Sequence, residues 1–196
     1  MEDEEDFDKA LDYFNKCFGV AKDSNNKDEE AACYQQMGQI FKKQDNLEQA
    51  TYYLKKFLEI SEEGGDARKE MQAEAHKQLS DIYSAQGNVT TAIQHLNKLL
   101  TLAQQSGKKS AHADAFLKLG LLDYKEGYLK KSVEFLSRHF ELARTGEEKD
   151  QKLIDMSRIN LGIAEANTKI EQYKKLVLND TQALLEWKVN KKFKKA

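Results

Sequence analysis

Small residues recur along this chain at a nearly constant spacing, and that spacing restricts the fold more than any other feature. One series, spaced by 40, 42 and 40 residues, consists of Ala10, Ala50, Ala92 and Ser132. A second series, spaced by 42, 40 and 42 residues, consists of Gly38, Ser80, Gly120 and Gly162. The first three members of the second series each lie 12 residues before a member of the first. A fixed period of this length is typical of stacked supersecondary units.

The segments around these small residues have the hydrophobic periodicity of helices. In "EEAACYQQMGQIFKKQ" the large residues Tyr34, Met37 and Phe41 fall on one face at helical spacing. The segment "LEQATYYLKKFLEI" repeats the pattern after a short turn, and equivalent turns occur at 44–46, 86–88 and 126–128. Because small residues let two helix axes approach closely, Gly38 and Ala50 are predicted to face each other within one helix pair.

Composition agrees with an almost wholly helical chain and excludes several classes of protein. None of the 196 residues is proline, where average usage would give roughly ten. The net charge of −2 offers no general basis for binding nucleic acid or a membrane. No apolar run approaches the roughly 18 residues of a membrane span. The acidic start "MEDEEDFD" is unlike a signal peptide, and two cysteines are too few for a disulfide framework, which favours a reducing compartment.

The motif positions of these units resemble the tetratricopeptide repeat (TPR), in its long-spaced form of 40–42 residues. The unit that carries the resemblance best supplies an aromatic, a Met-Gly pair, a second aromatic, an alanine and a leucine; these residues are Tyr34, Met37, Gly38, Phe41, Ala50 and Leu54. The resemblance implies an all-α TPR-like solenoid of stacked antiparallel helix pairs that coils into a right-handed superhelix. It predicts one solenoid over 1–196, with a half unit at 4–22 and units at 28–64, 69–106, 110–145 and 150–190.

Both ends of the predicted solenoid are atypical. The chain opens with the second helix of a pair, so the apolar face of that helix is expected to lack half of its cover. At the other end, "QYKKLVLNDTQALLEWKVNKKFKK" is predicted to form a long, degenerate terminal helix that caps the stack.

No pattern in the sequence predicts catalysis, a cofactor or a metal. The two cysteines, Cys17 and Cys33, fall at positions of packing residues in the other units and are not spaced as a zinc pair. The four histidines are not placed at i, i+3 or i, i+4 with an acid between them. "SGKKS" lacks the preceding glycine and strand of a phosphate-binding loop. The protein is therefore predicted not to be an enzyme.

The TPR resemblance implies a concave surface lined by the first helix of each pair, and such surfaces bind proteins. The predicted partner-binding residues are Gln35, Gln39, Lys42, Lys43, Lys77, Asp81, Leu117, Leu121, Tyr124, Met156, Ile159 and Ile163. This lining is polar in its first half and apolar in its second, and an apolar patch of this kind is expected to be covered. The cover is either the chain's own C-terminal segment or a helix or extended peptide from a partner, and Trp187 is a candidate anchor in both cases. Glu74 and Asp114 stand where a chaperone-tail clamp needs cations, which argues against that role.

The expected function is a non-catalytic scaffold or adaptor in the cytoplasm. "RINLGIAEANTKIEQY" and "ALLEWK" resemble the C-terminal parts of ciliary axonemal TPR proteins. That resemblance implies a place in the cilium or flagellum, with dynein-arm or docking proteins and the microtubule wall as partners. A lysine-rich C-terminus suits an acidic surface of this kind. The alternatives are a cytosolic adaptor of polarity, transport or chaperone complexes and a peptide-sensing regulator; nucleic acid and membranes are not expected as partners.

Overall fold

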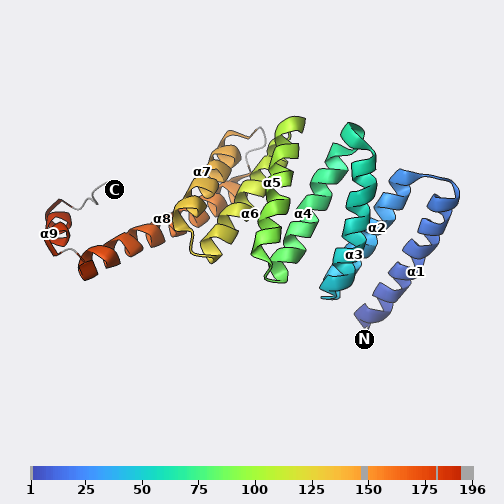
Figure 1. The fold of residues 1–196 in the computed structure, drawn as a ribbon, viewed down its shortest axis with the longest axis horizontal. Helices are drawn as coiled ribbons and strands as arrows, with labels where there is room; N and C mark the ends of the chain where they lie inside the picture. Colours follow the sequence, from blue (N-terminus) through green and yellow to red (C-terminus); the bar gives the residue numbers. More distant parts are fainter. Residues whose placement is uncertain (1, 147–149, 180, 191–196) are drawn as a thin grey trace. The chain divides into compact units, whose positions relative to one another are not determined.

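The computed structural model describes residues 2–146, 150–179 and 181–190, and within them the chain is all-α, without a strand, as predicted (Figure 1). The elements, with one short 3-10 helix η1, are α1 Glu2–Asp23, α2 Lys27–Lys43, α3 Leu47–Glu63, η1 Gly65–Arg68, α4 Lys69–Ala85, α5 Val89–Ser106, α6 Lys109–Lys125, α7 Leu129–Thr145, α8 Gln151–Asn179 and α9 Thr181–Asn190.

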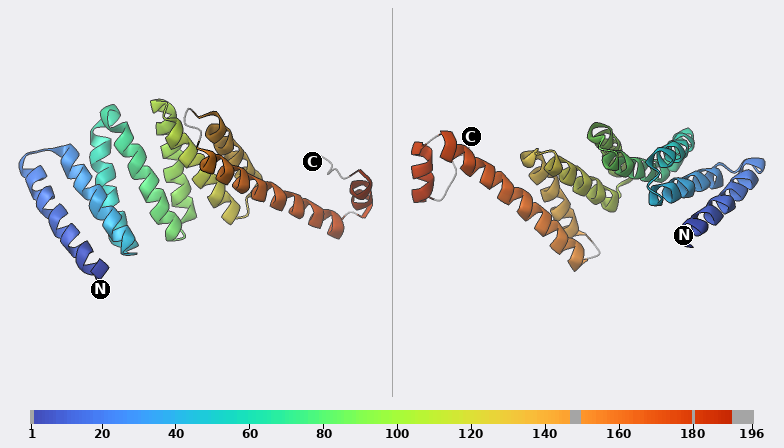
Figure 2. Two further views of the ribbon diagram at one scale, coloured as in Figure 1. Left: turned by 180° about the vertical axis from the view of Figure 1, so that it is seen from behind. Right: turned by 90° about the horizontal axis from the view of Figure 1, so that it is seen from below.

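The chain divides into two compact units, Met1–Ala115 and Phe116–Ala196, and the division falls inside α6. In the first unit each helix from α1 to α4 packs against the next one along the chain, which produces stacked antiparallel neighbours (Figure 2). In the second unit α7 packs against α8, and α8 against α9. The stacked helix pairs confirm the predicted fold class, while the single superhelix over 1–196 stays a prediction.

The short turns between helices have a common backbone design. Asn26, Asn46 and Asn88 each precede a helix, and the side-chain oxygen of each accepts a hydrogen bond from the backbone N–H three residues later. Such N-caps satisfy donors that the first helical turn leaves unpaired. The residue before each cap has a positive φ, and it is Asp45 in one turn and Gly87 in another. The predicted turns at 44–46 and 86–88 are therefore built from the residues that this conformation favours.

The small residues mark the close approach of paired helices, as predicted. A Cβ atom added to Gly38 would lie 2.8 Å from Leu54 Cγ and 3.5 Å from the carbonyl oxygen of Ala50. Gly120 lies in the same way against Leu136, with 2.7 Å from an added Cβ to Cγ. Ser132 replaces the alanine of the earlier pairs, and its buried hydroxyl donates to the carbonyl oxygen of Gly120 at 2.8 Å.

The core of the first unit consists of side chains from α2, α3 and α4 that interdigitate beside these crossings. Leu54, Phe57, Leu79 and Ile82 are almost completely buried there. Burial of such side chains is the dominant favourable term in folding. The polar faces of the same helices carry the charged residues, which explains how a chain with 33% charged residues still builds a continuous core.

The C-terminal part differs from the predicted helix pair and long terminal helix within 150–190. Helix α8 is 29 residues long and continues through 168–170, where the earlier units have their turn. Those positions hold Thr168, Lys169 and Ile170, and none of them readily adopts the positive φ that a turn requires. Lys174 also stands where a small residue would let a second helix approach. The chain therefore continues as one helix and then forms the short α9.

Candidate protein-binding surface

The predicted lining residues of the first unit are polar, and several of them are joined by ion pairs. Lys42 on α2 donates to Asp81 on α4 at 3.3 Å, and Lys77 on α4 pairs with Asp114 on α6. Burial lowers the pKa of Lys77, but the hydrogen bond and the charge of Asp114, together with the charges of Glu74 and Asp81, outweigh it and raise the pKa above its ordinary value. These ion pairs connect α2 to α4 and α4 to α6, which are the first helices of successive repeats. Lys42, Lys77 and Asp81 therefore each have a structural partner within the chain.

The remaining polar lining residues lie on α2. Gln35 and Gln39 are half-buried, whereas Lys42 and Lys43 are exposed near the end of the helix. Beside Lys77 the helices α4, α5 and α6 enclose a polar hollow of 300 Å³, and Lys108 pairs with Glu70 on its wall at 2.6 Å. This half of the predicted lining is therefore a charged surface with mixed sign.

The predicted lining residues of the second unit form an apolar surface on α6 and α8. Asn167 on α8 donates to the hydroxyl of Tyr124 on α6 at 2.7 Å, which brings the two helices side by side. We define the apolar face as the six predicted residues on these helices, namely Leu117, Leu121, Tyr124, Met156, Ile159 and Ile163. Leu117 and Tyr124 are half-buried, and the exposed fractions of the other four lie between 43% and 58%.

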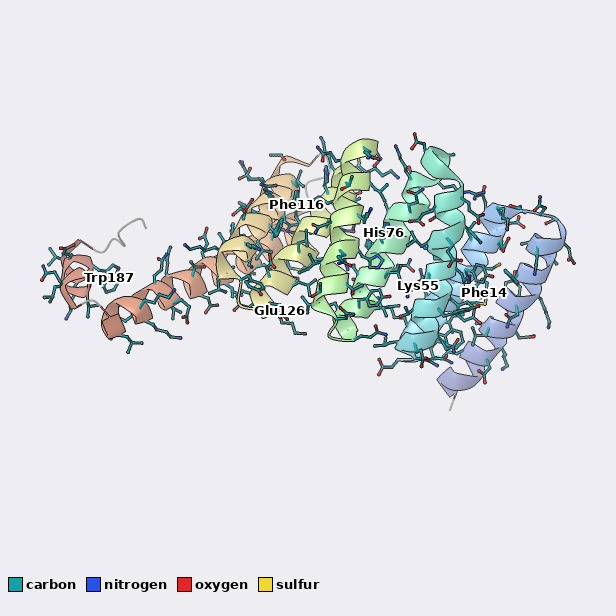
Figure 3. All side chains as sticks on the ribbon, viewed as in Figure 1. Phe14, Lys55, His76, Phe116, Glu126 and Trp187 are labelled. Carbon is teal, nitrogen blue, oxygen red and sulfur yellow. The ribbon has the colours of Figure 1, made fainter. Side chains whose placement is uncertain are left out.

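The C-terminal segment packs elsewhere and leaves the apolar face open. Trp187 on α9 lies against Tyr173 near the end of α8, with 4.9 Å between the ring centroids. Figure 3 shows Trp187 at the opposite end of the second unit from Phe116. Trp187 therefore anchors α9 to α8. Most of the lysine-rich C-terminus, which would suit an acidic surface, lies at 191–196, outside the described residues.

Two histidines that spacing along the sequence does not connect meet in the first unit. The Nδ1 atoms of His76 on α4 and His95 on α5 are 2.9 Å apart, so one neutral ring donates to the other. Burial, the neighbouring His95 and Lys98 together lower the pKa of His76 to about 4. Burial and Lys55 also lower the pKa of His95. Figure 3 shows His76 within the first unit.

A signal for this pair was present in the repeat pattern. His76 lies four residues before Ser80, and His95 lies three residues after Ala92. Because Ser80 and Ala92 mark the crossing of two antiparallel helices, residues one turn away from it on each helix become neighbours. Only two nitrogen ligands meet here, and in the part of the chain that the structure describes no cluster of three or more His, Cys, Asp or Glu could hold a metal.

The cysteines line a groove between α1 and α2 in the first unit. This groove has a volume of 510 Å³, and Tyr13 and Val20 form its exposed rim. Both thiols are free; Cys17 is half-buried and Cys33 is buried. Burial raises the pKa of Cys33, which keeps this thiol protonated and unreactive at neutral pH. The environment of Cys33 therefore fits the predicted packing role.

Comparison with known proteins agrees with this architecture. Two family models described as "Tetratricopeptide repeat" match the chain, one over residues 2–63 and the other over 73–106. The chain thus carries tetratricopeptide repeats in these ranges. No curated protein sequence matches it significantly, and none of the helices within the described ranges has the length and apolar character to cross a membrane.

Two solved structures share the fold at low sequence identity. The crystal structure of BtubC (BKLC) from P. vanneervenii has a TM-score of 0.77 and 17% identity, and the match covers 100% of this chain and 79% of that one. The apo form of RapI has a TM-score of 0.76 and 12% identity, over 89% of this chain and 47% of that one. At these identities the likeness concerns the fold.

Proposed function

We propose that this chain is a non-catalytic scaffold that holds a segment of a partner protein on the apolar face of its second unit. Tetratricopeptide repeats are generally protein-interaction modules, and the matches over residues 2–63 and 73–106 support such a role for this chain. We further propose that the apolar face is the binding surface and that its ligand is a single segment of the partner. A helix or an extended peptide suits an elongated apolar surface formed by two neighbouring helices.

The exposure of Leu121, Met156, Ile159 and Ile163 is the observation that carries the proposal. Contiguous apolar surface of this kind is unusual on a protein without a binding partner. Each half-exposed aliphatic side chain that becomes buried contributes about 1 kcal/mol. The four residues together can therefore supply a useful part of the free energy of binding. The charged residues on the first unit would contribute less to binding, because they already form ion pairs within the chain.

A quantitative capture experiment tests the site. Wild type is compared with a Leu121→Asp, Ile163→Asp variant, and captured proteins are identified by mass spectrometry and then titrated as purified partners. The variant is expected to lose the partner because two carboxylates would be buried in the interface. Val20→Asp is the matched control, since it places the same charge at an exposed aliphatic residue of the first unit.

Circular dichroism melts decide whether the double variant is informative. If the variant melts like wild type and still binds every partner with unchanged affinity, the apolar face is not the binding site. If Val20→Asp abolishes binding to the same extent, the interaction depends on the first unit, and the proposal for the site is wrong.

For the cellular setting, we propose a ciliary axonemal scaffold that binds dynein-arm or docking proteins. The support is the resemblance of Arg158–Tyr173 and Ala183–Lys188 to the C-terminal parts of axonemal TPR proteins. Isolated axonemes should then contain the protein, and the captured partners should include dynein-arm or docking components. Exclusive recovery of the protein outside the axoneme, with other partners, would contradict this setting while leaving the scaffold function intact.

A further inference from the structure

Helix α8 carries an exposed apolar stripe that continues well beyond the apolar face. Its members are spaced alternately by three and four residues: Met156, Ile159, Ile163, Ala166, Ile170, Tyr173 and Val177. All seven are exposed, and the six larger ones have exposed fractions between 41% and 58%. We call this set the α8 stripe. A strict alternation of three and four is the a/d pattern of a coiled-coil seam.

The α8 stripe is separate from the side of α8 that packs within the second unit. Ser157 and Ala164 are completely buried, and they lie on a different face of the helix from the stripe. The unit therefore uses one side of α8 for its own core and leaves a second apolar side without cover. Near the C-terminal end of the stripe, Trp187 of α9 contacts Tyr173, which nevertheless stays 41% exposed.

We infer that the α8 stripe pairs with the α8 stripe of a second copy of the chain, in antiparallel orientation. This inference rests on the proposed binding function, because the first three stripe residues belong to the apolar face, and it identifies the partner there. The stripe is about 30 Å long at 1.5 Å per residue. It offers roughly 500 Å² of apolar surface, so two copies would bury about 1,000 Å², which is near the lower limit for a specific interface.

The charges that flank the α8 stripe select the orientation. In a parallel pair, Lys169 would face Lys174 of the other copy across the seam, and like charges in these positions are unfavourable. In an antiparallel pair centred between Ile163 and Ala166, Lys169 instead faces Gly162 of the other copy. Gly162 has no atom within 4 Å of an added Cβ, so the lysine has room there.

The antiparallel register also matches the sizes of the stripe residues. Met156 meets Tyr173 of the other copy, Ile159 meets Ile170, and Ile163 meets the small Ala166. The two-fold axis repeats each of these contacts, which gives six apolar layers. Tyr173 therefore faces the flexible Met156 and Ile163 faces a small residue, while Ile159 and Ile170 form a layer of two aliphatic side chains of equal size. A self-complementary patch of this kind is the usual basis of a symmetric dimer.

The oligomeric state of the full chain tests the pairing. Light scattering coupled to gel filtration, over increasing concentration, should show wild type moving from the monomer mass of 22.5 kDa to twice that value. Ile170→Asp should weaken the dimer by about a hundredfold, because each interface would bury two carboxylates. Leu178→Asp is the matched control; Leu178 is 79% exposed and lies outside the α8 stripe, so this variant should dimerise like wild type.

Cysteine cross-linking tests the orientation. Mild oxidation of an Ile159→Cys, Ile170→Cys double variant should link two chains, because these positions face each other in the antiparallel pair. Each single variant should not link, since equivalent positions are then about 16 Å apart along the helix. The unmodified chain measures the background from Cys17 and Cys33. Cross-linking of the single variants would overturn the antiparallel arrangement.

The outcomes separate this inference from the proposed function. A wild-type chain that stays monomeric at every concentration overturns the pairing, even if capture of partners still depends on Leu121. A monomer whose capture of another protein is lost in Ile170→Asp and kept in Leu178→Asp would assign the α8 stripe to a helix of that protein. Equal dimerisation of wild type and Ile170→Asp would place the dimer contact elsewhere, and the inference would be wrong.

Discussion

Replacement of glycine by alanine should have opposite effects at two equivalent positions of the repeat, Gly120 and Gly162. Both glycines lie inside helices, where alanine is favoured over glycine by about 1 kcal/mol. At Gly162 an added Cβ meets no atom within 4 Å. Gly162→Ala should therefore stabilise the protein by about 1 kcal/mol, which corresponds to roughly 2–4 °C in melting temperature for a chain of this size.

At Gly120 the same helix preference is outweighed by a steric clash. The added Cβ would lie 2.7 Å from Leu136 Cγ and 3.3 Å from the backbone nitrogen of Leu136, whose side chain is 1% exposed. Displacing a buried side chain in this way costs about 1–3 kcal/mol. After the helix preference is subtracted, Gly120→Ala should destabilise the protein by about 1 kcal/mol, so the two variants should differ by about 2 kcal/mol.

Urea unfolding and thermal melts followed by circular dichroism at 222 nm, the far-ultraviolet helix band, measure both variants against wild type. Gly38→Ala is a further control, because an added Cβ there meets Leu54 at 2.8 Å and the expected sign is that of Gly120→Ala. A clear loss of stability in Gly162→Ala would refute the reasoning. Such a loss would mean that a second helix packs against Gly162, as one packs against Gly38 and Gly120.

Three further changes test other parts of the fold. Tyr128 precedes α7 without a capping side chain, whereas α2, α3 and α5 have asparagine there; Tyr128→Asn should raise the free energy of unfolding by about 0.5–1 kcal/mol in urea titrations. The pKa of His76 is lowered to about 4 in the folded state, so the unfolded chain binds more protons between pH 6.5 and 4, and stability falls as the pH falls through this window. The loss between pH 7 and 5 should be about 1–2 kcal/mol, and His76→Phe should reduce this pH dependence; an unchanged profile would assign the loss to other groups. Ser132→Ala removes the hydrogen bond to Gly120 but fits the site, so melts should show a cost of about 1 kcal/mol, and a cost above about 3 kcal/mol would contradict this account.

The sequence predicted the helix pairs because their signals are local. Gly38, Ala50 and the turn at 44–46 each depend on a few neighbouring residues, and each was placed correctly. The period also assigned Leu121, Met156 and Ile163 to one surface, and all three are exposed; their role in binding stays a prediction. The period does not predict which residues of one repeat contact which residues of the next. The pairs Lys42–Asp81 and Lys77–Asp114 depend on the rotation of one helix relative to the next.

The C-terminal part shows where reasoning from the repeat fails. Leu161 and Gly162 keep the motif, and they suggested a further helix pair, but the residues that decide the matter lie later, at Thr168 to Ile170. A turn needs a residue that tolerates positive φ. Because no such residue stands at 168–170, the chain continues as a helix there even though the Leu-Gly motif is present. The α8 stripe was missed for a related reason. Its first three members were assigned to the groove, and the continuation to Val177 has meaning only when α8 is one uninterrupted helix.

The length of α8 has a mechanical consequence. A helix of 29 residues measures about 43 Å, and its completely buried residues, Ser157 and Ala164, both lie in its first half. It can therefore work as a lever arm: a tilt of about 10° at the packed end would move the far end by roughly 7 Å over that length. Whatever binds near Met156 could in this way reposition α9 and Trp187, so that a small adjustment at one end of the second unit becomes a large displacement at the other.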